Sequence, residues 1–73
     1  MKKTRFAKEY KQLARKLKDV RKKAHIEQTE LAAKLGKHQS YISKIETAAR
    51  HVDIFELKEL SKLLKKKINY FIN

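Results

Sequence analysis

Residues 28–46 read QTELAAKLGKHQSYISKIE, and the order of small and apolar residues in this stretch predicts two short helices joined by a tight turn. Gly36 lies where the chain must leave the first helix through a left-handed backbone conformation, which a residue without Cβ adopts at little cost. Ala32 lies where the two helices should cross closest, so a larger side chain would push them apart. The stretch therefore predicts a helix-turn-helix.

These two helices separate an apolar set from a polar set. The apolar residues can face one core from helices that cross at about 90–120°, a geometry that lets the second helix enter a DNA major groove; they are Leu31, Leu35, Ile42 and Ile45. The polar residues of the second helix point outward, as a surface that reads bases requires; they are Gln39, Ser40, Ser43 and Lys44.

Length and composition limit the fold class. The 73 residues suffice for one small domain, expected over residues 1–73, that buries ~60–65% of its unfolded surface. The chain has no cysteine and no proline and only one glycine, which excludes disulfides and thiolate metal sites and favours an all-α fold. A polar start and the lack of an apolar run near ~18 residues predict a cytoplasmic protein rather than an exported or membrane-spanning one.

The formal net charge of +12 favours a polyanionic partner. A surface this basic attracts nucleic acid from a distance and binds it in a salt-dependent way. Lysine-rich helix faces can also be merely solvated, so the charge does not decide the partner alone. Around a helix-turn-helix, it favours nucleic acid.

Helical spacing predicts further elements on either side of the motif. One helix should run from about Phe6 to Ala24, and its apolar positions are Tyr10, Leu13, Ala14, Leu17, Val20 and Ala24. The motif helices should span about 28–35 and 39–47. Another helix should begin at Asp53, because Asp53 and Glu56 have the spacing of a capping box, and its apolar stripe is Ile54, Leu57, Leu60 and Leu64. Residues 1–5 are expected to form a loose basic arm.

From about Glu9 to Phe71 the chain resembles the phage-repressor Cro-like (XRE-type) helix-turn-helix family. The resemblance is carried by QTELAAKLGK at 28–37 and QSYISKIE at 39–46, in this order and at this spacing. It implies a compact five-helix, lambda-repressor-like DNA-binding domain with the helix-turn-helix at its second and third helices. It also implies a transcriptional regulator that binds operators as a dimer and has no enzymatic activity.

Five positions depart from the family pattern. His25 replaces the glycine after the first helix, so either a residue with Cβ takes that turn or the turn changes shape. Ala48 and Ala49 replace Gly-Glu, and we expect the third helix to be longer by up to a turn, because alanine continues a helix. His51 replaces an arginine, which weakens a phosphate contact above about pH 6.5. Lys67 replaces a capping acid, so the last helix should start poorly.

The resemblance also implies which residues contact DNA. Gln28 would hold a phosphate, Gln39 and Ser40 would face base edges, and Ser43 and Lys44 lie one turn further on. A glutamine prefers adenine, with which it can form two hydrogen bonds. The predicted backbone contacts, which set position rather than sequence, are Gln28, Lys37, His38, Tyr41, Thr47, Arg50 and His51.

Other kinds of site are disfavoured. No two histidines are spaced i, i+4, so a metal site is not expected, and we expect no cofactor. The acids are scattered along helices, which argues against an enzyme. We expect Glu46 to be structural and to pair with a basic residue such as Arg21.

Two functions remain compatible with the residues. One is a sequence-specific regulator, a repressor or autoregulator, whose dimer reads two half-sites about 34–36 Å apart. The other is a non-specific basic architectural protein, and binding to an anionic membrane surface is a third, weaker reading. The dimer surface would comprise Ile68, Tyr70, Phe71 and Ile72, although these could instead close the core against Phe6 and Tyr10. Regulation would come from concentration, proteolysis or a separate protein partner, in a bacterial or phage-encoded setting.

Overall fold

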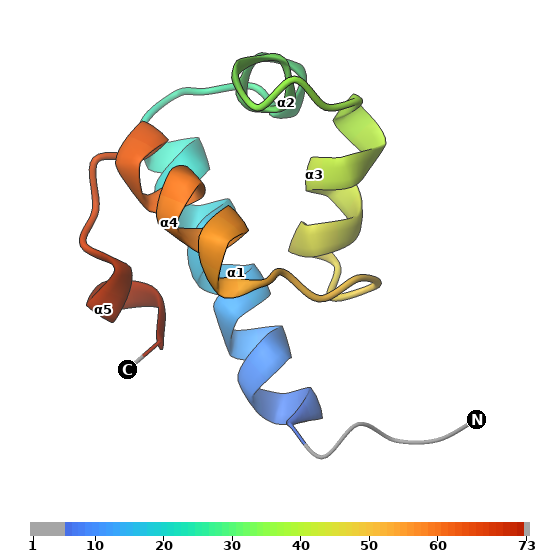
Figure 1. Ribbon diagram of the computed structural model, residues 1–73, viewed down its shortest axis with the longest axis vertical. Coiled ribbons are helices and arrows are strands. Elements are labelled where there is room, and N and C mark those ends of the chain that lie inside the picture. Colours follow the sequence, from blue (N-terminus) through green and yellow to red (C-terminus); the bar gives the residue numbers. More distant parts are fainter. Residues whose placement is uncertain (1–5, 73) are drawn as a thin grey trace.

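The computed structural model describes residues 6–72, and over this range the chain is all-α. Its elements are α1 (Ala7–Lys23), α2 (Gln28–Lys34), α3 (Gln39–Glu46), α4 (Ile54–Leu63) and α5 (Ile68–Ile72). The predicted five-helix, lambda-repressor-like fold is confirmed. The predicted basic arm, residues 1–5, lies outside the described residues, as does Asn73. Figure 1 shows α1 running through the middle of the molecule, with α4 in front of it and α3 at one edge.

One hydrophobic core joins all five helices. It includes Leu31, Ile42 and Ile45 from the predicted motif, and Leu35 packs against it partly buried. The predicted stripes of α1 and α4 supply most of the rest: Leu17, Val20, Leu57, Leu60 and Leu64. Two residues that were predicted to lie on the apolar faces of these helices are exposed instead. Ala24 is exposed because it follows the last turn of α1, and Ile54 is 50% exposed because the first turn of α4 projects beyond the core.

The first four helices end in the same way. The residue after each C-cap has a positive φ, and these residues are His25 (59°), Gly36 (68°), Ala48 (62°) and Lys65 (56°). The backbone amides of this residue and of the residue after it donate to carbonyls of the helix's last turn, as in a Schellman motif. Three of the four residues carry a Cβ, and the left-handed conformation costs such a residue about 1–2 kcal/mol.

The predicted roles of Gly36 and His25 at turns are therefore confirmed. An added Cβ at Gly36 would meet nothing within 4 Å, so this glycine is needed for its backbone conformation and not for space. The expected lengthening of the third helix is wrong. It ends at Glu46, because Ala48 turns left-handed and the amide of Ala49 donates to the carbonyl of Lys44 at 2.8 Å.

The predicted capping box at the start of α4 is present. The amide of Glu56 donates to Asp53 Oδ1 at 2.8 Å, and the amide of Asp53 donates to Glu56 Oε1 at 3.0 Å. The two bonds satisfy amides that would otherwise lack a partner at the helix start. They also fix the end of the loop that connects α3 to α4.

The short α5 packs back on α1. Phe71 is buried in the core, and the ammonium of Lys16 on α1 donates to the carbonyl of Tyr70 at 3.1 Å. A hollow of about 340 Å³ remains between the two helices, lined in part by Phe6, Tyr10 and Ile72. None of the helices in the described part of the chain has the length and apolar character needed to span a membrane.

Candidate nucleic-acid interface

The structure leaves the polar edge of α3 partly exposed. In Figure 1, α2 is seen nearly along its axis and α3 from the side, with a short turn between them. Of the four predicted base-reading residues, Ser40 and Lys44 are exposed, and Gln39 and Ser43 are half-buried. All four belong to one helix whose opposite side is buried through Ile42 and Ile45.

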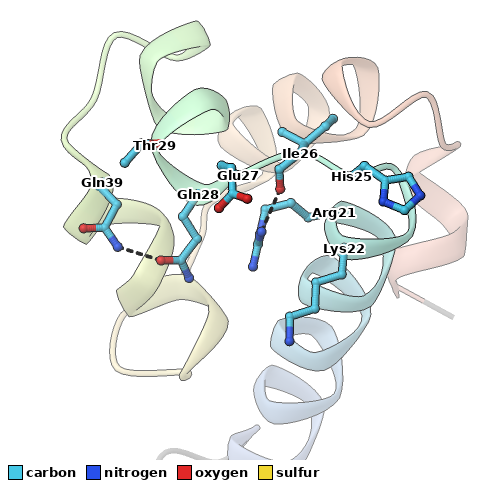
Figure 2. A pocket seen from close by; sticks show the side chains of 8 residues that line it. All are labelled: Arg21, Lys22, His25, Ile26, Glu27, Gln28, Thr29 and Gln39. Carbon is cyan, nitrogen blue, oxygen red and sulfur yellow. Dashed lines mark hydrogen bonds between the residues drawn. The ribbon is translucent and has the colours of Figure 1, made fainter.

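A chain of hydrogen bonds behind this edge holds Gln39. The Arg21 guanidinium donates to both carboxylate oxygens of Glu46, from Nε at 2.6 Å and from Nη2 at 3.0 Å. The side-chain amide of Gln28 donates from Nε2 to Glu46 Oε1 at 2.9 Å. Gln39 donates in turn to Gln28 Oε1 at 2.6 Å, as Figure 2 shows. The predicted Arg21–Glu46 ion pair is therefore confirmed, and it supports a polar network that reaches α3.

The ion pair is buried, and its side chains are only 8% (Arg21) and 3% (Glu46) exposed. The hydrogen bond to Glu46 is the main cause that raises the pKa of Arg21 above its usual value, against the opposing effect of burial. Arg21 also donates to the carbonyl of Ile26 at 2.7 Å, which ties the turn before α2 to α1. The pair therefore positions the start of the motif.

The network leaves donors and acceptors on Gln39 unused. An amide has two N–H groups and one oxygen, and Gln39 uses one N–H for Gln28. The other N–H and the oxygen suffice for two bonds to one adenine. Gln28 likewise retains one N–H for the predicted phosphate contact, and beside it lies a hollow of about 440 Å³ whose lining includes Lys22, His25 and Thr29 (Figure 2).

Three of the residues predicted to contact the DNA backbone, Lys37, Tyr41 and Arg50, come together around the Tyr41 ring. The Arg50 guanidinium carbon lies 4.5 Å from the centre of the Tyr41 ring, and the Lys37 ammonium lies 5.5 Å from it. The Tyr41 hydroxyl, for which we expected a phosphate partner, donates to Glu56 Oε2 at 2.6 Å. Arg50 Nη1 donates to the same oxygen at 3.2 Å.

The electrostatics of this cluster follow from its burial and hydrogen bonds. Burial raises the pKa of Tyr41 and the bond to Glu56 raises it further, to about 12. For Glu56, burial acts to raise the pKa, but bonds from Tyr41, the Asp53 backbone and Arg50 outweigh it, and the pKa is lowered. Glu56 is thus held as a carboxylate beside a cation and a neutral phenol.

The remaining predicted backbone residues are placed separately. His38 caps α3, with Nδ1 accepting from the amide of Ser40 at 3.2 Å. Thr47 donates its hydroxyl to the carbonyls of Ser43 and Lys44 at the end of α3. The exposed ring of His51 stacks on that of Tyr10, with centroids 3.6 Å apart and planes 1° from parallel. That stack links the loop after α3 to α1.

Sequence reasoning missed two of these features. The Tyr10–His51 stack joins positions far apart in the chain and has no local signature. Glu56 was predicted only as part of a capping box, and this prediction is correct. The capping-box spacing does not reveal that Tyr41 and Arg50 also donate to the Glu56 carboxylate. Within residues 6–72, no cluster of three or more potential metal-ligating side chains occurs.

Comparison with known protein families identifies the fold-defining part of the chain. Residues 17–71 match the model of a helix-turn-helix family, which covers most of the chain and all of α2 to α4. No curated protein matches the sequence. The family is one of DNA-binding regulators and not of enzymes.

Proposed function

The chain belongs to the XRE-type helix-turn-helix family of DNA-binding transcription regulators, and from this we propose that it binds a specific double-stranded sequence as a small repressor or autoregulator. The proposal places α3 in the major groove, with Gln39, Ser40, Ser43 and Lys44 as the residues that read bases. The chemistry involves no catalytic step and no cofactor. In a cell, the protein would act in the cytoplasm, on the DNA of a bacterium or phage.

The observation that carries this proposal is the hydrogen bond between Gln39 and Gln28. A free glutamine loses rotamer freedom when it binds a base, and this loss opposes binding. Gln39 is already held by Gln28, which is held by the buried Glu46. A base-reading side chain fixed in this way discriminates better than a mobile one, whereas a protein that only neutralises phosphates has no need of it.

Selection of bound duplexes from a random pool, followed by mutation of α3, tests the proposal. We expect one preferred sequence, and Gln39→Ala should lower the ratio of specific to random binding by about 5-fold to 150-fold, the range expected for one bidentate base contact. A matched control is Lys62→Ala, on the side of α4 that faces a hollow beside Ile68. It should weaken binding to both duplexes alike or not at all. An unchanged ratio for Gln39→Ala would reject base reading through α3.

The proposal includes a homodimer on a palindromic operator. Phe71 is committed to the core, so the surface available to a partner consists of Tyr70 and Ile72, which are 44% and 56% exposed, with half-buried Ile68 beside them. Exposed apolar side chains that lie together favour association. Sedimentation at high micromolar concentration, with and without a two-half-site duplex, should show two copies of the chain. A monomer under all conditions would remove the dimer but not the base reading.

The net charge supports a second candidate, a non-specific architectural protein. With 20 basic and 8 acidic residues, binding to random DNA should be strong at low salt. In that case selection would yield no consensus, and Gln39→Ala would have no larger effect than a surface control. A separate protein partner that regulates the chain remains part of the first proposal, and capture by the DNA-bound protein would test it.

A further inference from the structure

The Glu56 carboxylate joins three parts of the molecule. One oxygen, Oε1, accepts from the Asp53 amide at the start of α4. The other, Oε2, accepts from the Tyr41 hydroxyl on α3 at 2.6 Å and from Arg50, in the loop between α3 and α4, at 3.2 Å. A single side chain therefore fixes the distance between α3, this loop and α4.

The cations around Tyr41 border a surface hollow. It measures about 480 Å³, and its lining includes Lys37, Lys44 and Arg50, with the Tyr41 ring between them. Arg50 spends one of its five N–H donors on Glu56, so four remain. Its side chain is 38% exposed, so these donors can reach a ligand. Arg50 and Lys37, both at this hollow, can together receive a single phosphate group.

We infer that Glu56 is a positioning residue: it holds Arg50 against Tyr41 so that Arg50 and Lys37 together receive one phosphate of the DNA backbone. This inference rests on the proposed function and adds to it an acid on α4, which itself makes no contact with DNA. Placing a carboxylate near a phosphate site reduces the attraction for DNA. Its gain is orientation, because a guanidinium fixed by an ion pair and a ring loses less freedom when it binds.

Two variants that remove the same charge from the same helix test this role. Glu56→Gln keeps a residue that can complete the capping box but replaces the carboxylate that Arg50 and Tyr41 share. Glu59→Gln is the control, because Glu59 is exposed on α4. Each raises the net charge by one, which by long-range electrostatics alone strengthens DNA binding. We expect Glu59→Gln to leave the affinity unchanged or raise it, and Glu56→Gln to lower it by about 3-fold to 10-fold, as for other coupled contacts.

A double-mutant cycle of Glu56 and Arg50 distinguishes positioning from a purely structural role of Glu56, because only positioning makes the effects of the two substitutions on DNA affinity depend on each other. Arg50→Ala should reduce the slope of log affinity against log salt by about 0.9, the value for one phosphate contact. Glu56→Gln should reduce the slope by a smaller amount, and the double variant should be no weaker than Arg50→Ala alone. Circular dichroism and thermal melting establish that each variant is folded at the temperature of the assay. If Glu56→Gln unfolds, Tyr41→Phe takes its place as the test, because it removes a hydrogen bond to the Glu56 carboxylate without changing α4. Tyr41→Phe should also lower the affinity for DNA.

The outcomes separate this inference from the proposed function. If Gln39→Ala abolishes discrimination while Glu56→Gln behaves as Glu59→Gln does, the positioning role is wrong and the proposed function stands. Additive losses for Glu56→Gln and Arg50→Ala also overturn the positioning role. If Gln39→Ala leaves discrimination unchanged, the proposed function fails, but the coupling of Glu56 to Arg50 remains measurable with any duplex.

Discussion

Replacing Arg21 by methionine should destabilise the domain more than the loss of any exposed charge. Methionine keeps an unbranched apolar stem but removes the guanidinium, which donates twice to Glu46 and once to the carbonyl of Ile26. Glu46 would keep only the hydrogen bond from Gln28. A carboxylate that is 3% exposed would then lack its counter-charge.

The size of the effect follows from burial. Removal of one partner of a buried ion pair costs about 3–5 kcal/mol, because the other charge stays buried without compensation. A chain of this length has a total stability of about 4–11 kcal/mol. The melting temperature should therefore fall by about 12 °C or more. Lys22→Met, next to it on α1 but exposed, should change stability by less than about 0.5 kcal/mol.

Urea unfolding followed by circular dichroism measures both changes, and a double-mutant cycle assigns the cause. Glu46→Gln in the Arg21→Met background removes the stranded charge, so the double variant should be more stable than Arg21→Met alone. A loss below 1 kcal/mol, or a cycle without coupling, would show that the ion pair has no part in stability.

Three further predictions concern the helix ends and Tyr41. Ala48→Gly should stabilise the domain by about 0.5–1 kcal/mol in thermal unfolding, since a glycine at φ 62° carries no Cβ strain; destabilisation would contradict the Schellman interpretation. Asp53→Ala should cost about 1 kcal/mol by removing the N-cap of α4, and equal stability would contradict it. Absorbance at 295 nm should show one tyrosine that titrates near pH 12 and is missing in Tyr41→Phe. Because this folded pKa lies above the unfolded value of 10.0, the associated stability is present below pH 10 and is lost between about pH 10 and 12.

The sequence predicted the fold wherever a local signal coincided with the tertiary structure. The capping box of Asp53 and Glu56 and the turn at Gly36 are of this kind, because each depends on residues within one helix end. Ala48 shows the limit. Alanine favours helix by propensity, but Val52 must reach the core six residues after Glu46, and an α3 continued by another turn would carry the chain away from it. Tertiary packing therefore overrode propensity at that position.

The candidate site could be predicted only in part, for a related reason. The pairing of Glu46 with a basic residue such as Arg21 was predicted because Glu46 was expected to be structural, and its burial was seen only in the structure. Contacts of Tyr41 and Arg50 with Glu56 could not be deduced, because a surface tyrosine and arginine each have many possible partners within reach of a long side chain. Only the three-dimensional course of the loop between α3 and α4, visible below α3 in Figure 1, brings the three together.

Both acids that organise the α3 face act through other side chains: Glu46 holds Arg21 and Gln28, and Glu56 holds Arg50. In a chain of net charge +12, an acid beside the helix proposed to read DNA slows the approach to DNA, because association follows the net charge. The same acid prolongs the bound state if it fixes a contact in place, because dissociation depends on contacts made at close range. Neutralising Glu56 should therefore raise the association rate slightly and the dissociation rate more. A protein that binds by charge alone would show the first change without the second, so stopped-flow rates distinguish the two mechanisms even where equilibrium affinities change little.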